Sequence, residues 1–333
     1  MRLISMTNAE QLAAWQPDEM ALPPTDFARH APDAHCVLES DAGEIAARCS
    51  LWWRNTPPHP GHCLGVIGHY TARDARAAHA LLQHAARQLA ARGCTLAVGP
   101  MDGNTWRHYR LLSERSIDEH DDEPPFFLEP DNPDEWPQHF SGGGFAPLAH
   151  YLSAINDDLS LEDPCAARIT QRLEAANVRI RSLDMSRLEA EMALIYAVAA
   201  IGFRHNLLYT PIEQAEFLEL YRPLLPYVCS ELVLIAEQRG QPVGFSFTLP
   251  DWLQEKRGQR CDTVIMKTLA VLPGRNYAGL GSILAARTQR VARDLGYGRI
   301  IHALMHEGNN ARNLSARYNA RPFRRYTLYS RLL

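Results

Sequence analysis

Two glycines one residue apart, Gly279 and Gly281, lie between an apolar segment and an amphipathic one. The apolar segment, Thr263–Leu272, is rich in β-branched residues and predicts a strand that ends at Pro273. The amphipathic segment has apolar residues at helical spacing and ends at Gly296, so it predicts a helix. Glycines at such a junction expose main-chain N–H groups at a helix N-terminus, where these groups can bind a diphosphate.

Two common diphosphate-binding loops do not fit this segment. A Walker loop ends in Gly-Lys-Ser/Thr, and no lysine follows Gly281. The dinucleotide fingerprint needs a third glycine or alanine at Leu284 and an acidic residue about twenty positions further on. The chain there has no carboxylate and reads Arg299-Ile300-Ile301-His302. The pyrophosphate of coenzyme A remains as the candidate ligand.

The segment Val271–Gly281 resembles the acyl-CoA loop of the GCN5-related N-acetyltransferase (GNAT) superfamily. The pattern of that loop is Gln/Arg-x-x-Gly-x-Gly/Ala after a strand. Asn276 stands where the family usually has Gln or Arg, and Arg275 lies next to it.

The chain downstream of the loop strengthens the resemblance. The segments Asn309–Tyr318 and Tyr326–Tyr329, with Phe323 between them, resemble the closing asparagine, helix, tyrosine and final strands of the family. Pro322 stands in place of the usual glycine. The resemblance covers roughly Val178–Leu333.

The resemblance implies direct transfer of an acetyl group from acetyl-CoA to the amine of a small-molecule or peptide acceptor. It assigns the polarisation of the thioester carbonyl to the backbone near Leu269–Val271. It also makes Tyr318 the proton donor to the leaving thiolate, although a tyrosine that only packs the last helix is an alternative. The implied acyl-CoA-binding residues are Leu269, Ala270, Val271, Arg275, Asn276, Tyr277, Ala278, Gly279, Leu280, Gly281, Ser282 and Asn309.

No residue type or spacing identifies the catalytic base. His302, His306 and Glu307 lie on or just after a predicted strand at Arg299–Met305, and His302 and Glu307 are candidate catalytic residues. The two histidines share strand parity, so we expect them to face the same way. Histidines satisfied in the core or at the surface remain an alternative, and no metal is expected.

Bulk composition restricts the class of protein. At 333 residues the chain exceeds a usual single domain, and 34 basic against 38 acidic residues do not favour a nucleic-acid partner. No apolar run has the length of a membrane span, and the N-terminus lacks the pattern of a secretion signal. The seven cysteines are widely spaced and contain no Cys-x-x-Cys. We therefore expect a cytoplasmic protein without a membrane partner, whose oligomeric state stays open.

The first half of the chain repeats the order of the second half. His69 at a predicted strand end and Gly93 at a predicted helix end are 24 positions apart, as are Leu272 and Gly296. This repeat predicts an internal duplication. The sequence thus predicts an α+β fold of two tandem GNAT-like domains, 1–157 and 158–333. Each domain is expected to be a mixed, mostly antiparallel twisted sheet flanked by helices.

The two halves are not equivalent at the glycine loop. When Gly93 is aligned with Gly296, Arg76 and Ala78 stand at the positions of the two glycines. A side chain at the first position would occupy the space that a diphosphate needs beside the backbone. The first half is therefore expected to be degenerate, with one active site in the second half.

Three further segments carry predictions. The segment Ser113–Pro137 is rich in acidic residues and prolines, which fits either a solvated loop or a negative rim that attracts an amine, with Phe126–Leu128 docking it onto the body. Thr105–Leu112 is predicted as a short helix. Ser186 and Glu189 form the pattern of a capping box at the start of another helix.

Two other classes of function remain open on the sequence alone. One is a non-catalytic module that binds acyl-CoA, because the base is not identified. The other is a transferase that uses aminoacyl-tRNA, as some tandem GNAT-like proteins do. The acceptor and the length of the acyl chain cannot be inferred from the sequence.

Overall fold

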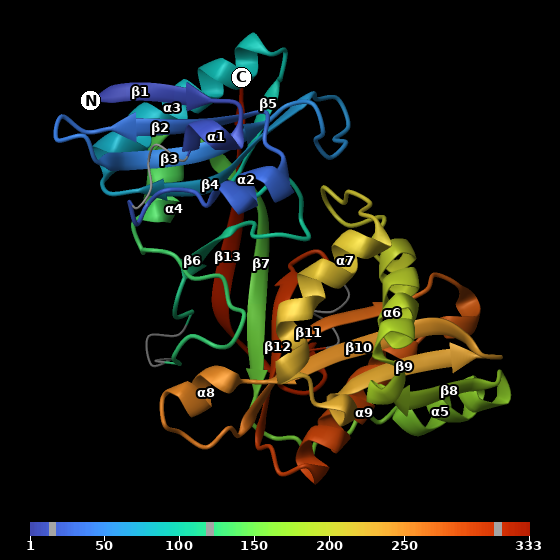
Figure 1. Cartoon of the computed structure of the whole chain (residues 1–333). Coiled ribbons are helices and arrows are strands. Elements are labelled where there is room, and N and C mark those ends of the chain that lie inside the picture. Colours follow the sequence, from blue (N-terminus) through green and yellow to red (C-terminus); the bar gives the residue numbers. More distant parts are fainter. Residues whose placement is uncertain (13–17, 118–122, 310–314) are drawn as a thin grey trace.

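The computed structural model describes residues 1–12, 18–117, 123–309 and 315–333 (Figure 1). Within these residues, thirteen strands form one continuous sheet. Part of the predicted closing segment, residues 310–314, and the acidic residues Asp118, Glu119, Asp121 and Asp122 lie outside the described residues.

The first half supplies one wing of the sheet. Its strands are β1 (Arg2–Met6), β2 (Ala34–Glu39), β3 (Ile45–Trp52), β4 (Leu64–Ala72), β5 (Leu96–Gly99), β6 (Leu111–Glu114) and β7 (Ala146–Asn156). Its helices are α1 (Ala9–Leu12), α2 (Pro24–His30), α3 (Ala75–Ala91) and α4 (Trp136–Gly142). Helix α3 packs on one face of β2 and β3, and α1 and α2 pack on the other face.

The second half supplies the other wing. Its strands are β8 (Val178–Ser182), β9 (Val233–Gln238), β10 (Gln241–Pro250), β11 (Thr263–Val271), β12 (Arg299–His306) and β13 (Arg321–Leu332). Its helices are α5 (Ala166–Ala175), α6 (Leu188–Gly202), α7 (Gln214–Tyr221), α8 (Trp252–Lys256) and α9 (Leu280–Asp294). Helices α6 and α7 cover one face of this wing, and α5 and α9 cover the other (Figure 1).

The two wings exchange their last strands. The sheet order is β1-β2-β3-β4-β5-β13-β7-β12-β11-β10-β9-β8, with β6 paired to β13. The last strand of the chain, β13, therefore pairs with β5 of the first half, and β7 of the first half pairs with β12 of the second half. The proposed division between residues 157 and 158 stays a prediction, because each half completes the sheet of the other.

The predicted repeat is visible in the topology. In each half a strand, a helix and a second strand form a unit in which the two strands pair in parallel, β4 with β5 and β11 with β12. Both helices end before a glycine with positive φ, Gly93 at 84° and Gly296 at 90°. The predicted α+β fold, a mixed sheet flanked by helices, is confirmed.

Two local predictions are wrong. The segment Thr105–Leu112 forms turns that lead into β6 and not a helix. Ser186 does not cap α6, because the Asp184 carboxylate accepts hydrogen bonds from the main chain and hydroxyl of Ser186 and shapes a 3₁₀ turn before the helix. A nearby carboxylate thus outcompetes the expected serine cap.

The described acidic residues between β6 and α4 are mostly paired with arginines. Their pairs are Glu114 with Arg325, Glu123 with Arg299 and Arg321, Glu129 with Arg324, and Asp131 and Asp134 with Arg115. Phe126 is 2% exposed and packs against Phe323, as expected for a docked loop. The pairs of Glu114, Glu123 and Glu129 hold the segment on β12 and β13, whereas those of Arg115 lie within the segment. This pairing disfavours a rim that attracts amines.

Candidate active site

The two parallel strands of the second half separate in the middle of the sheet. β11 and β12 pair from Thr263↔Arg299 only as far as Met266↔His302. Beyond that point β11 continues along β10, and β12 continues along β7 to the pair His306↔Tyr151. The main-chain groups on one edge of Lys267–Val271 therefore have no strand partner, and we call this separation of β11 from β12 the opening.

An extra residue in each strand produces this separation. On β11, Met266 pairs with Thr248 and Thr268 pairs with Phe247, which leaves Lys267 as the bulged residue. On β12 the register against β7 shifts between His302 and Met305, and Leu304 has a φ of 60°. A bulge bends its strand, so two bulges at the same level direct the strands apart.

The glycine loop leads from the open end of β11 to the start of α9. Gly279 is the N-cap residue with a φ of 81°, and no side chain caps the helix. The main-chain N–H groups of the first turn, from Leu280 to Ser282, therefore point out of the helix end without a side-chain acceptor. The residues fit a diphosphate, since the positive end of the helix dipole adds to these donors.

Contacts from α5 fix the conformation of this loop. A Cβ at Gly279 would lie 2.9 Å from a side-chain carbon of Ile169, so both the positive φ and the packing require glycine. The Arg172 guanidinium donates to the carbonyl oxygen of Ala278, and the Tyr277 hydroxyl donates to Gln238 at 2.8 Å. The donors at the helix start are therefore held in place by packing.

The predicted proton donor Tyr318 lies in the core beside the opening. Its ring is fully buried, belongs to the same hydrophobic cluster as Met266 and Ala285, and meets the His302 ring edge-on at 6.5 Å. Among the described residues, neither the Tyr318 hydroxyl nor His302 Nε2 has a hydrogen-bond partner. Burial raises the pKa of Tyr318 to about 12, so its phenol keeps its proton at neutral pH.

His302 and His306 do not face the same way, so that prediction is wrong. His302 Nδ1 is 2.9 Å from the Ser315 hydroxyl on the α9 side, whereas the His306 ring packs edge-on against Tyr151. The bulge between the two histidines reverses the parity of the strand. Burial lowers the pKa of His302 to about 4, which makes it a weak base.

The remaining predicted residues divide into three groups. A Glu307 carboxylate oxygen lies 3.5 Å from the Arg325 guanidinium, away from the partners of His302. The Asn309 main-chain N–H donates a hydrogen bond to the His306 carbonyl. Arg275, Asn276 and Ala278 are exposed on the loop. Leu280 and Ala270 are buried, so only their main-chain groups can contact a ligand. The roles assigned to all these residues stay predictions.

The sequence analysis missed Lys267, one of only two lysines in the chain. Its side chain is half-buried at the bulge, and in the described part of the chain its ammonium makes no hydrogen bond or ion pair. Burial, together with the positive charge of Arg110, lowers the pKa of Lys267 to about 8. Arg110 is held by stacking between the rings of Tyr109 and Tyr151 at 4.1 and 4.2 Å. The sequence feature that could have identified Lys267 is a single lysine within an otherwise apolar predicted strand.

Arg317 was also missed. Its guanidinium lies 3.0 Å from Asp163 and 3.5 Å from the Ser282 hydroxyl, at the first turn of α9. The arginine is half-exposed, so it can turn toward a phosphate bound at the helix start.

The corresponding opening in the first half is closed. β4 and β5 also separate, after Val66↔Val98, but the Met101 main chain then crosses the gap and donates to the Ile67 carbonyl at 2.8 Å. A Cβ at Gly68 would lie 2.1 Å from the Met101 carbonyl oxygen, which shows how tightly the gap is filled. A carrier arm has no room between these strands.

The helix start in the first half is also blocked. The Asp74 carboxylate caps α3 and accepts the Ala77 N–H at 2.7 Å. An anion would therefore meet a negative charge at a donor that is already used. Together with the closed gap, this supports the predicted degeneracy of the first half.

The face of β11 opposite α9 is covered by aromatic residues from both halves. Trp106 of the first half donates to the Thr210 carbonyl at 2.8 Å and meets the rings of Phe203, Tyr209 and Phe217. The end of α6 approaches the open end of β11, where a Cβ at Gly202 would be 3.4 Å from Ala270. An acceptor that reaches β11 from this side would meet a largely aromatic wall.

A cavity of about 370 Å³ lies elsewhere, at the start of β11. Charged residues, among them Glu123, Asp251, Arg257 and Arg299, line it together with Thr263. The nine residues of β11 span about 30 Å, which separates this cavity from the glycine loop. It does not belong to the candidate active site.

Sequence comparison gives one informative relative. No family model matches the chain. The bacterial ceramide synthase of Caulobacter vibrioides (strain NA1000 / CB15N) is 28% identical over 213 residues, which are 63% of this chain and 53% of that protein. The chain thus spans about half the length of the curated relative that it matches.

Solved structures show the fold. A conserved protein of Enterococcus faecalis V583, described as a probable N-acyltransferase, has a TM-score of 0.58 at 10% identity and covers 99% of this chain and 72% of its own. A GCN5-related N-acetyltransferase from Anabaena variabilis has a TM-score of 0.53 at 10% identity, and the match covers 99% of this chain and 73% of that one. The GCN5-related glucosamine N-acetyltransferase region of a fungal multi-domain β-N-acetylglucosaminidase has a TM-score of 0.53 at 14% identity. The match covers 99% of this chain and 38% of that one. The chain therefore has the GNAT fold.

The first prediction tests the diphosphate site. Gly281→Asp places a carboxylate in the first turn of α9, where it suits the helix dipole. Its Cβ meets the flexible Leu269 side chain at 3.3 Å and Val271 at an ordinary 3.9 Å. We expect this variant to fold and to lose the stabilisation by acetyl-CoA, which is about 2.7 kcal/mol at 100 times the dissociation constant. Thermal unfolding with and without acetyl-CoA measures the difference.

Arg76→Asp is the matched control, because it places the same charge on the exposed first turn of α3. It should leave the shift with acetyl-CoA unchanged. An equal loss in both variants would contradict the assignment of the site to the second half.

The second prediction concerns the unpaired hydroxyl of Tyr318. Tyr318→Phe removes a buried polar atom without a described partner, so we expect the free energy of unfolding to rise by about 1 kcal/mol. Turnover should fall by about tenfold or more, because the proton donor is lost. Urea unfolding and steady-state kinetics measure the two effects.

Tyr326→Phe is the control, because the equally buried Tyr326 hydroxyl bonds to Glu129 at 2.7 Å and to Ser153 at 3.2 Å. This variant should lose stability. If Tyr318→Phe also loses stability and keeps full turnover, Tyr318 is a packing residue only.

In the described residues no helix combines the length and apolar character needed to cross a bilayer.

Proposed function

We propose that this protein is an N-acyltransferase that transfers the acyl group of an acyl-CoA, with acetyl-CoA as the first donor to test, to the amine of a second substrate. The observation that carries the proposal is the opening between β11 and β12, which ends at an uncapped helix start with a left-handed glycine. This combination accepts an extended arm along a strand edge and a diphosphate at the helix end. Its absence from the first half confines the reaction to one site.

The chain supplies binding groups at three levels of the opening. The N–H groups of Leu280, Gly281 and Ser282 and the guanidinium of Arg317 would hold the diphosphate. The unpaired main-chain edge of Lys267–Val271 would orient the arm and donate to the carbonyl oxygen as negative charge develops. Bound acyl-CoA supplies the activated thioester.

Two side chains would move the protons. Lys267, with a pKa of about 8, has a neutral fraction near neutral pH and can accept a proton from the acceptor ammonium. Tyr318 keeps its proton because of burial and can donate it to the leaving thiolate. They lie at the same level of the opening, since the Tyr318 ring meets His302 and His302 pairs with Met266, the residue before Lys267.

A second candidate is the transfer of a longer acyl chain to a long-chain amine. Two observations favour it: the relative is named a ceramide synthase, and aromatic rings line the acceptor side of β11. Ceramide formation is also the acylation of an amine, so both candidates belong to one reaction class.

Release of free CoA tests the proposal. The full chain is mixed with acyl-CoAs of increasing chain length, from acetyl to palmitoyl, and with a panel of short polar and long-chain amines. We expect thiol release that depends on an added amine, and the preferred pair distinguishes the two candidates. Tight binding of acyl-CoA without amine-dependent release would instead support a non-catalytic acyl-CoA-binding module. Transfer only from aminoacyl-tRNA would support an aminoacyl-tRNA-dependent transferase.

The third prediction concerns Lys267. Lys267→Met removes the proposed base, and we expect turnover to fall by about 100-fold or more while acyl-CoA binding stays intact. In the native protein only the neutral amine accepts a proton, so turnover should rise as pH increases through about 8. The variant should lose this limb of the pH profile.

Lys256→Met is the control, since it removes the other lysine, which is exposed on α8. It should keep both rate and pH profile. If the limb near pH 8 persists in Lys267→Met, the titrating group is the acceptor amine and Lys267 is not the base.

A further inference from the structure

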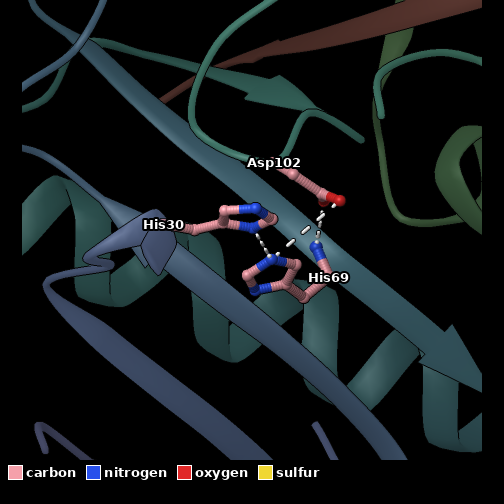
Figure 2. A group of neighbouring side chains, drawn as sticks. All are labelled: His30, His69 and Asp102. Carbon is pink, nitrogen blue, oxygen red and sulfur yellow. Dashed lines mark hydrogen bonds and ion pairs between the residues drawn. The ribbon is translucent and has the colours of Figure 1, made fainter. Parts of the chain in front are cut away.

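Three potential metal ligands from distant segments meet in the first half of the chain. His30 is the last residue of α2, His69 lies on β4, and Asp102 lies in the segment after β5. One ring nitrogen from each histidine and one carboxylate oxygen all lie within 4.8 Å of one another (Figure 2). The site lies where the gap between β4 and β5 is closed, on the face away from α3.

We propose that His30, His69 and Asp102 bind one divalent transition-metal ion of the zinc class. Two imidazoles and a carboxylate are ligands that zinc accepts, at metal–ligand distances of about 2.0–2.2 Å. Ligand atoms on such an ion lie about 3.4 Å apart in tetrahedral geometry. His30 Nδ1 and His69 Nε2 are 2.7 Å apart, and His69 Nε2 and Asp102 Oδ2 are 3.9 Å apart. These two distances therefore need to change by less than about 1 Å each, and the His30–Asp102 pair starts within 4.8 Å.

The two facing ring nitrogens share a single proton. Without an ion, one histidine donates to the other across the 2.7 Å contact. Both nitrogens present lone pairs when His69 carries its proton on Nδ1 and His30 carries its proton on Nε2. The ion would then take the place of the shared proton, and neither histidine would change its charge.

A second layer of hydrogen bonds favours this tautomer of His69. Its Nδ1 lies 2.8 Å from the Ser50 hydroxyl, which in turn lies 2.8 Å from Nδ1 of the buried His35. His69 can thus donate to Ser50 while Ser50 donates to His35. Metal-binding histidines typically donate their other N–H to such a partner.

The carboxylate of Asp102 is only half used. Its Oδ1 accepts the His69 main-chain N–H at 2.5 Å, which fixes the carboxylate beside the ring. Among the described residues Oδ2 accepts no hydrogen bond, and its nearest recorded charge partner is His69 Nε2. An oxygen in this position can complete the ligand set, and the partial exposure of His30 and Asp102 leaves room for a water as fourth ligand.

The two neighbouring arginines mostly bind the carbonyl groups around the site. Arg48 donates to the His69 carbonyl at 2.7 Å. Arg107 donates to the carbonyls of His30 and Asp102 and is neutralised by Glu216 at 2.6 Å. Arg48 leaves one positive charge nearby, which favours an ion with high affinity for imidazole, such as Zn²⁺, over Mg²⁺ or Ca²⁺.

Metal titration tests this proposal and does not depend on acyl transfer. The full chain is treated with a chelator and titrated with Co²⁺, which reports on zinc sites through its visible absorption, and then with Zn²⁺ as competitor. We expect one Co²⁺ per chain, its displacement by Zn²⁺ and a rise in melting temperature with Zn²⁺. Absence of binding, or binding without a change in melting temperature, would overturn the proposal.

Variants locate the ion. His30→Asn and Asp102→Asn change partly exposed side chains, and each should lower the affinity at least tenfold while the circular dichroism stays native. The control is His59→Ala with His62→Ala, which removes a surface histidine pair whose rings are 5.6 Å apart, next to the exposed Cys63. This control should keep the Co²⁺ spectrum. Loss of the spectrum in the control, with retention in the other two variants, would place the ion on the surface and refute the site.

Discussion

The separation of β11 from β12 is the constraint on which the active site depends. A continuous parallel ladder would satisfy every main-chain group of these strands, yet pairing stops at Met266↔His302. The ladder cannot continue because each strand is held by its other neighbour: β11 by β10 up to Val271, and β12 by β7 up to His306. The free energy of the missing hydrogen bonds is available to a ligand that pairs with the exposed edge.

The exchange of strands makes the first half part of this constraint. β7 belongs to the first half in sequence and pairs with β12 where β12 leaves β11. β13 lies between β5 and β7 and pairs with both. The first half also reaches the acceptor side through Trp106 and through the ion pair of Arg107 with Glu216 on α7. The first half, whose own strand gap is closed, therefore still determines the geometry of the opening in the second half.

The sequence predicted the fold and the location of the glycine loop because both depend on local rules. Alternating or periodic apolar residues define strands and helices, and a glycine beyond a helix end needs no tertiary information. Side-chain direction near the opening was not predictable, since one inserted residue reverses it. The bulge at Lys267 turned an inconspicuous lysine into a candidate base, and the shift before Met305 turned His306 away from His302. The failed capping box at Ser186 and the missing helix at Thr105 show the same limit, because Asp184 and the strand β6 decided those segments.

The closed and the open strand pairs differ in whether the buried polar groups beside them are hydrogen-bonded, and this difference separates their roles. Near the end of β4, three residues before Ala72, the ring nitrogens of His69 both have partners in Ser50 and His30, where the aligned position of the second half has the apolar Leu272. Beside β11, the Tyr318 hydroxyl and His302 Nε2 have none among the described residues. A buried polar atom without a partner costs about 1–3 kcal/mol, and a fold retains such atoms where a ligand completes them. These two unsatisfied atoms lie at the open strands, where an extended organic substrate can enter. The hydrogen-bonded histidines lie at the closed strands. A single metal ion could enter there by displacing the proton between His30 and His69.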